Sequence, residues 1–214
     1  MSGVDLGSGN IMTLKKPEIL MLIGEGISSY EAGEVWHLLD TRMQMPVTKV
    51  QIRQFDRIEF HKYNVMVMVS GGYSQLDSVK QQKLKSWVSQ GNTLVTIRNA
   101  SEWIIKQKLV SEILIEEKKD TIVKQLPYIT AREHIGKERI GGAIFSVELD
   151  LTHPLCFGYH EKEIPVYRNS TVWLKPSKNP YSTVAKYTED PLIDGFITDK
   201  NMNDKLKKSA SLIV

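Results

Sequence analysis

The stretch NVMVMVSGGY at positions 64–73 constrains the fold more than any other part of the sequence. Five successive residues, 65–69, are apolar, so a strand formed here would be buried on both faces. Such strands are typical of the centre of a parallel sheet that helices cover on both sides. The two glycines that follow predict a turn where the strand ends.

Similar apolar runs alternate with helical patterns through the first half of the chain. Further strands are predicted at 18–23, 47–52 and 92–97. Helices are predicted after Ser28, at about 75–90, and at 99–109. This alternation favours a doubly wound α/β layer with right-handed crossovers.

The two longest helical patterns predict which side chains face the core. Ser28 and Glu31 fit the Ser-x-x-Glu capping pattern at the start of the first helix, and Gly91 stands where the second helix should stop. The side chains predicted to face inward are Ala32, Val35, Trp36, Leu39, Leu76, Val79, Leu84, Trp87 and Val88.

After about residue 115 the alternation of predicted strands and helices ends. Strands are predicted within 141–159, at 164–174 and at 182–187, and a helix entering a strand is predicted at 199–214. We therefore expect one α/β domain over 17–214, with a mostly parallel sheet and a β-rich second half. The Gly/Ser-rich segment 1–16 is predicted to be a linker.

Composition excludes some classes of protein and leaves others open. Of 214 residues, 41% are hydrophobic and 25% charged, which is typical of a folded globular chain. The net charge of +3 is too small to indicate a nucleic-acid partner. No apolar run reaches the length of a membrane span, and the first residues do not resemble a signal peptide.

The Gly24-Glu25-Gly26 turn resembles a phosphate-binding loop only superficially. It lacks the Gly-x-Gly-x-x-Gly spacing of a dinucleotide site and the Gly-Lys-Ser/Thr of a P-loop. The carboxylate of Glu25 would also repel a phosphate at a helix N-terminus. A tight turn followed by a helix cap is the favoured interpretation.

Two other patterns could carry chemistry. Cys156 follows His153 closely, as in a nucleophile pair, but its neighbours are apolar and predict a buried, unreactive thiol. His160 and Glu163 have the His-x-x-Glu spacing of some zinc hydrolases, yet no His follows them to complete the ligand set. We therefore predict neither a catalytic residue nor a metal site in this chain.

The carboxyl edge of the sheet is the place where an open α/β fold would bind a ligand. The residues expected to line it follow three separate predicted strands: Glu25, Ser29, Tyr30, Gly72, Tyr73, Asn99 and Ser101. These residue types suit a polar neutral or cationic small molecule of unknown identity. A protein-docking surface, or a vacant edge, is the alternative.

Several long strings resemble one bacterial module. They are KPEILMLIGEGISSYEAGEVWHLLD (16–40), YNVMVMVSGGY (63–73), LKSWVSQGNTLVTI (84–97) and GGAIFSVELDLTHPLCFGYHEKEIPVYRNS (141–170). Together they resemble the glutamine-amidotransferase-like domain that follows the catalytic domain in bacterial zinc carboxypeptidase-like proteins. The resemblance spans about residues 16–214.

The resemblance implies a flavodoxin-like sheet, a secreted or periplasmic parent protein, and zinc only in the parent's catalytic domain, which would be this chain's partner. An active amidotransferase would carry Cys at the strand–helix elbow near Asn99 and Ala100, together with a late His-x-Glu pair, and this sequence has neither. The family pattern also predicts a further strand and helix after residue 214. A non-catalytic accessory domain is therefore expected.

Two alternatives stay open: a free-standing hydrolase or amidase that uses Cys156 or a metal, and a small-molecule binding module without chemistry.

Overall fold

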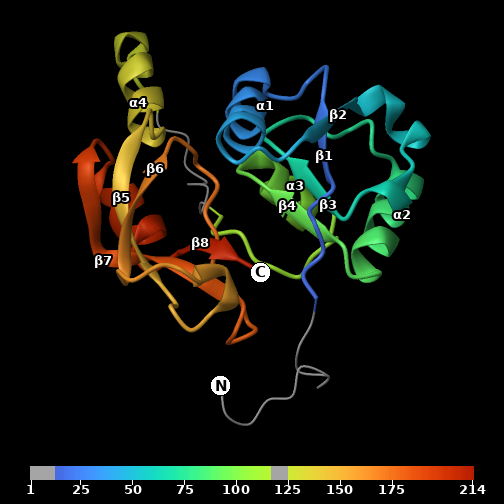
Figure 1. Ribbon diagram of the computed structural model, residues 1–214. Helices are drawn as coiled ribbons and strands as arrows, with labels where there is room; N and C mark the ends of the chain where they lie inside the picture. Colours follow the sequence, from blue (N-terminus) through green and yellow to red (C-terminus); the bar gives the residue numbers. More distant parts are fainter. Residues whose placement is uncertain (1–12, 117–124) are drawn as a thin grey trace, which may run out of the picture. The chain divides into compact units, whose positions relative to one another are not determined.

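A computed structural model describes residues 13–116 and 125–214 of the chain (Figure 1). This part divides into two compact units, one ending at Ala100 and the other beginning at Ser101. Each unit has its own four-stranded sheet. The sequence-based boundaries, a linker at 1–16 and a domain at 17–214, stay predictions, and residues 1–12 lie outside the described part.

The first unit contains the parallel sheet that the sequence predicted. Its strands lie in the order β2-β1-β3-β4, and every neighbouring pair is parallel. The bounds are β1 Ile19–Ile23, β2 Val47–Gln51, β3 Val65–Met68 and β4 Thr93–Thr96. β3 is a central strand, and its residues Met66, Val67 and Met68 are all buried, as the apolar run indicated.

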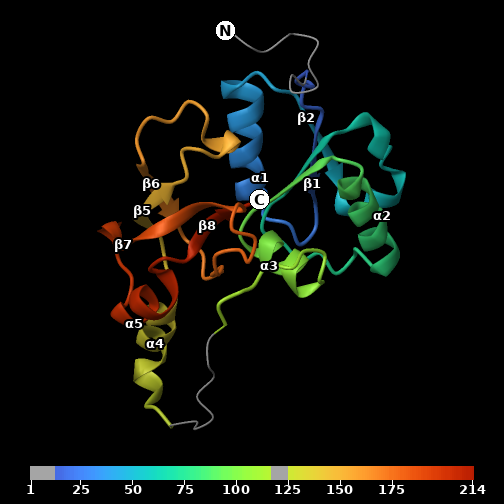
Figure 2. The same ribbon diagram turned by 90° about the horizontal axis from the view of Figure 1, so that it is seen from below.

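Helical connections cover both faces of this sheet. The crossover from β1 to β2 contains α1 (Ser29–Trp36) and the π-helical segment η1 (His37–Arg42), and the one from β3 to β4 contains α2 (Ser78–Ser89). Figures 1 and 2 both show α1 and α2 on opposite sides of the strands. Two 3₁₀ turns, η2 (Ile52–Arg57) and η3 (Phe60–Lys62), join β2 to β3. The helix α3 (Asn99–Lys106) follows β4.

The α2 side has an aromatic cluster that fixes the 3₁₀ turns to the helix. Phe60 lies edge-on to both Phe55 and Trp87, with ring centroids 5.4 and 5.9 Å away. The indole Nε1–H of Trp87 donates to the carbonyls of Phe60 and Tyr63. Gly91 ends the helix with a φ of 91°, as predicted.

Three of the residues predicted to face the core do not. Val79 is 75% exposed because the buried face of α2 runs through Leu84 and Trp87, and Val88 also lies at its margin. Trp36 is 41% exposed, and the ammonium of Lys49, rather than the core, covers its ring. Spacing alone placed these side chains at the edges of an apolar stripe, where exposure varies most.

The second unit is built on an antiparallel sheet in the order β6-β5-β7-β8. Its strands are β5 Ala143–Leu149, β6 Glu163–Arg168, β7 Thr183–Gly195 and β8 Ala210–Ile213. The β-rich second half is thus a separate antiparallel sheet and not an extension of the parallel one. Its remaining helices and turns are η4 Tyr128–Thr130, α4 Ala131–Glu138, η5 Pro154–Cys156, α5 Asp199–Asn201 and η6 Met202–Leu206.

The strand predicted at 164–174 ends earlier than expected, at Arg168. The guanidinium of Arg168 donates to the carbonyls of Ser170 and Val172, so the chain turns back around this side chain. The same group lies 4.2 Å from the ring centre of Trp173 and donates to the hydroxyl of Tyr187 at 3.0 Å. Arg168 therefore organises the core of the second unit.

Candidate functional site

The loops that follow β1 and β3 are joined by backbone hydrogen bonds at the carboxyl edge of the parallel sheet. Gly72 N–H donates to Gly26 O, and Ser28 N–H donates to Ser70 O, both at 2.8 Å. A Cβ on Gly71 would come within 2.9 Å of Gly26 O, so this approach requires glycine. The Gly-Glu-Gly turn is therefore a structural partner of the Ser-Gly-Gly turn.

The carboxylate of Glu31 connects three loops of this edge. Its Oε2 accepts a hydrogen bond from the backbone N–H of Ser70 at 2.8 Å. Its Oε1 accepts a short hydrogen bond from Arg98 Nη1. The pair is mostly removed from water, with 13% of the Glu31 side chain and 29% of the Arg98 side chain exposed.

Only one of the two hydrogen bonds of the predicted capping pattern forms at the start of α1. Ser28 Oγ accepts from Glu31 N–H at 3.3 Å, as the pattern predicts. The Glu31 carboxylate, however, binds Ser70 and Arg98, and the Ser28 N–H finds its acceptor in Ser70 O. The helix cap thus also connects β1 to β3 and β4.

Arg98 occupies the elbow between β4 and α3. Its φ is 54°, a left-handed conformation that is unusual for a residue with a Cβ. Strand–turn–helix elbows of this kind present a nucleophile above the sheet in hydrolases. A guanidinium stays protonated in proteins and cannot act as a nucleophile or a general base there.

Ser70 and Tyr73 turn their hydroxyls into the interior. Ser70 Oγ is buried and has no hydrogen-bond partner among the described residues. Tyr73 is 1% exposed and its hydroxyl donates to Val69 O at 2.5 Å. Burial raises the pKa of Tyr73 above its ordinary value, and the nearby charge of Glu31 adds to this effect.

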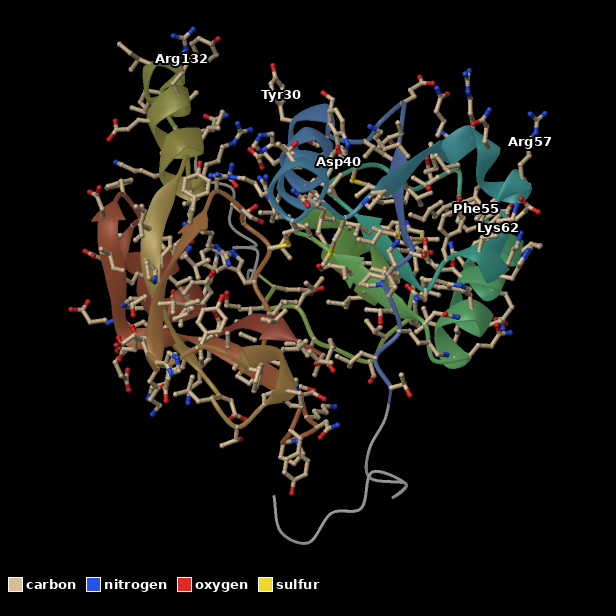
Figure 3. All side chains as sticks on the ribbon, viewed as in Figure 1. Tyr30, Asp40, Phe55, Arg57, Lys62 and Arg132 are labelled. Atoms are coloured by element: carbon tan, nitrogen blue, oxygen red, sulfur yellow. The ribbon has the colours of Figure 1, made fainter. Side chains whose placement is uncertain are left out.

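The predicted ligand-binding residues follow the carboxyl ends of β1, β3 and β4, which neighbour one another in one parallel sheet. Glu25, Ser29, Gly72 and Asn99 are exposed. Tyr30 is 86% exposed and projects away from α1 (Figure 3). Tyr73 presents no ring to solvent, and Ser101, on α3, is half-buried. Their role in binding stays a prediction.

Sequence reasoning did not single out Glu31, Ser70 and Arg98 as a connected group. Ser70 and Arg98 lie beside the predicted edge residues Gly72 and Asn99, and Glu31 was recognised only as a capping residue. No spacing rule indicates that one carboxylate will bind a backbone amide 39 residues away and a guanidinium 67 residues away. The sequence indicated only that polar residues follow the ends of the two strands that precede Ser70 and Arg98.

The other two candidate motifs lie in the second unit. Cys156 is buried, as predicted, and His153 Nδ1 accepts a hydrogen bond from Leu155 N–H, which caps the turn η5. Glu163 accepts from Ser146 Oγ at 2.9 Å, whereas His160 lies exposed before β6. Within residues 13–116 and 125–214, no three His, Cys, Asp or Glu side chains group as metal ligands would.

The comparisons with known proteins bear on the fold. No protein-family model matches the sequence, and no curated protein matches it. A crystal structure of a ThuA-like protein from Parabacteroides merdae is similar to this chain, with a TM-score of 0.52 and 13% sequence identity. The match covers 91% of this chain and 74% of that protein.

The chain has a mixed α/β fold with one parallel and one antiparallel sheet, and this likeness is consistent with a glutamine-amidotransferase-like fold. It therefore supports that part of the sequence resemblance. In the described part of the chain, no helix combines the length and apolar character needed to cross a bilayer.

Proposed function

We propose that this chain is a non-catalytic domain that binds a ligand or a protein partner through the carboxyl edge of its parallel sheet. The observation that supports this function is Arg98 at the elbow. The resemblance places the nucleophile of an active amidotransferase near Asn99 and Ala100, and the residue before them, Arg98, carries a guanidinium paired with Glu31. A domain of the proposed kind would keep the location of an active site without the group that performs acyl transfer.

The sequence resemblance suggests the protein in which such a domain works. We propose that it is the accessory domain of a zinc carboxypeptidase, with a flavodoxin-like sheet and with zinc held by the parent's catalytic domain. This part of the proposal rests on the quoted sequence strings alone. It is tested by the reading frame upstream of Met1, which should encode a His-x-x-Glu motif and a distant downstream His.

Activity and metal content of the purified chain test the non-catalytic role. We expect no hydrolysis of glutamine, of amides or of peptides with a free carboxyl end, and no stoichiometric zinc by elemental analysis. One zinc per chain that is lost in His160→Ala would contradict the proposal. Turnover that disappears in Cys156→Ala would favour the hydrolase alternative.

Chemical-shift mapping with ¹⁵N-labelled chain tests the binding surface. Because Glu25 contributes a negative charge at this edge, we expect amines and zwitterionic amino acids to shift the amides of Glu25, Gly72 and Asn99. Glu25→Lys should abolish these shifts. Tyr181→Ala, which removes an exposed ring of the second unit, is the matched control. Shifts confined to other residues would disprove the proposed surface.

A further inference from the structure

A cavity of about 360 Å³ lies within the first unit, between α1 and the strands β1 and β2. Its volume falls in the range of pockets that hold small molecules, about 300–1,000 Å³. The strand register explains its composition. Met21 and Lys49 are paired neighbours of β1 and β2, so their side chains share the face that α1 covers.

The wall of the cavity is mainly apolar. Met21, Ile23 and Ile27 come from β1 and the turn after it, and Ala32 and Trp36 come from α1. Met21 and Ala32 are buried, whereas Trp36 is 41% exposed at the rim. A ligand here would therefore exchange water contacts for contacts with aliphatic groups and one indole ring.

Gly33 keeps this space open. It lies in the interior of α1, where glycine costs about 0.5–1 kcal/mol relative to alanine. Its backbone does not require glycine, because only residues with a left-handed φ do, and Gly33 is not among them. A Cβ at this position would meet no atom within 4 Å. Neither the backbone conformation of Gly33 nor contact with neighbouring atoms requires a glycine at this position. The open cavity beside Gly33 is consistent with a residue that has no side chain.

One cation stands at the mouth of the cavity. Lys49 is exposed, and its Nζ lies 3.5 Å from the centre of the Trp36 ring, a cation–π contact. No carboxylate of the described residues forms an ion pair with it. A cation above an apolar wall is complementary to a molecule with a carboxylate at one end and an apolar body.

We propose that this cavity binds a small amphipathic carboxylate, an aryl- or alkyl-carboxylic acid, with its apolar body against Gly33 and Trp36 and its carboxylate on Lys49. Ser29, one of the predicted edge residues, also lines this cavity. Gly33, Trp36 and Lys49 belong to neither the Glu31–Arg98 pair nor the predicted edge residues, so variants of these three test the cavity apart from the carboxyl-edge surface. The ligand of this cavity would be an anion, whereas the ligands expected at that edge are cationic or neutral.

The test uses ¹⁵N-labelled full chain titrated with phenylacetate, 4-phenylbutyrate and octanoate, and with the corresponding primary amides. We expect the acids to shift the Trp36 indole N–H and the Gly33 amide, and to bind at least fivefold more tightly than their amides. Lys49→Met should remove this preference, so that the acids and their amides bind with equal affinity. Equal binding of acids and amides by the unaltered chain would overturn the assignment of Lys49.

Variants of Gly33 test the cavity itself. Gly33→Leu should weaken binding of the acids at least tenfold, because its side chain fills the space beside Trp36. Gly33→Ala, a smaller change, should weaken it less. If Gly33→Leu fails to fold by circular dichroism, Gly33→Ala and Lys49→Met decide the question. No shift at Trp36 and Gly33 with millimolar acid, or unchanged binding in the Gly33 variants, would refute the site.

Discussion

Arg98 Nη1 donates a hydrogen bond to Glu31 Oε1 across 67 residues of sequence. The other oxygen of the same carboxylate accepts from Ser70 N–H. One side chain on α1 therefore connects the ends of β3 and β4. The pair therefore joins three segments of this edge through one carboxylate.

Breaking the pair should destabilise the fold. Glu31→Gln keeps an acceptor for Ser70 N–H but removes the charge opposite Arg98. Because both groups are mostly buried, we expect the free energy of unfolding to fall by about 1.5–3 kcal/mol. Urea denaturation measures this change. Glu189→Gln, which breaks the exposed pair with Lys208, is the control and should change nothing measurable.

Arg98 variants separate the ion pair from the backbone conformation. Arg98→Ala loses the pair and keeps a Cβ at a φ of 54°, whereas Arg98→Gly loses the pair and relieves the left-handed conformation. Arg98→Gly should therefore be more stable than Arg98→Ala by about 1 kcal/mol. Equal stabilities would show that the left-handed conformation costs nothing at this elbow.

Two glycines of the first unit should respond oppositely to alanine. Gly71→Ala places a Cβ 2.9 Å from Gly26 O, a backbone atom, so the two turns must separate and stability should fall by about 1–3 kcal/mol. Gly33→Ala meets no atom within 4 Å and should raise stability by about 0.5–1 kcal/mol. Urea denaturation of both variants beside the unaltered chain measures the contrast. A loss of stability in Gly33→Ala would show that the helix needs glycine there.

The parallel sheet was the most predictable part of the fold. The run at 65–69 predicted a strand buried on both faces, as at the centre of a parallel sheet, and the strand β3 is central. The antiparallel sheet of the second unit was harder, because alternation predicts strands without giving their partners. The end of β6 could not be predicted, since it depends on the contacts of one side chain, Arg168, with carbonyls beyond it.

The candidate site was predictable in location and not in detail. Parallel strands bring their carboxyl ends together whatever the side chains are, so Glu25, Gly72 and Asn99 could be placed at one edge. The burial of Tyr73 depends on a hydrogen bond to Val69 O, four residues earlier, which composition does not reveal. The Glu31–Arg98 pair depends on the rotation of α1 relative to the sheet, which spacing fixes only approximately.

Cys156 should react slowly in the folded protein. Its side chain lies in the core of the second unit with Phe145, Trp173 and Leu206, and it is 4% exposed. A thiol reagent needs an accessible thiolate, which burial denies. Ellman's reagent at neutral pH should label less than a tenth of the chain during the time in which it labels the urea-unfolded chain completely. Stoichiometric labelling of the folded chain within seconds would contradict this burial.

Tyr73 should make the stability of the first unit sensitive to alkaline pH. Burial raises the pKa of its phenol above the ordinary value of 10.0, so the folded state favours the protonated form. The stabilisation is complete below pH 10, where the phenol is protonated in the unfolded chain as well. It is lost as the pH rises above 10, because only the unfolded chain then releases the proton readily.

At neutral pH, Tyr73→Phe should cost about 0.5–1.5 kcal/mol, since the hydrogen bond to Val69 O is removed. Above pH 10 this difference should shrink and then reverse, because the phenylalanine variant has no proton to lose. Urea denaturation between pH 7 and 11 measures both parts, with Tyr181→Phe, at an 82% exposed ring, as the control. A difference between the unaltered chain and Tyr73→Phe that stays constant over this range would show that the phenol titrates alike in the folded and unfolded chain.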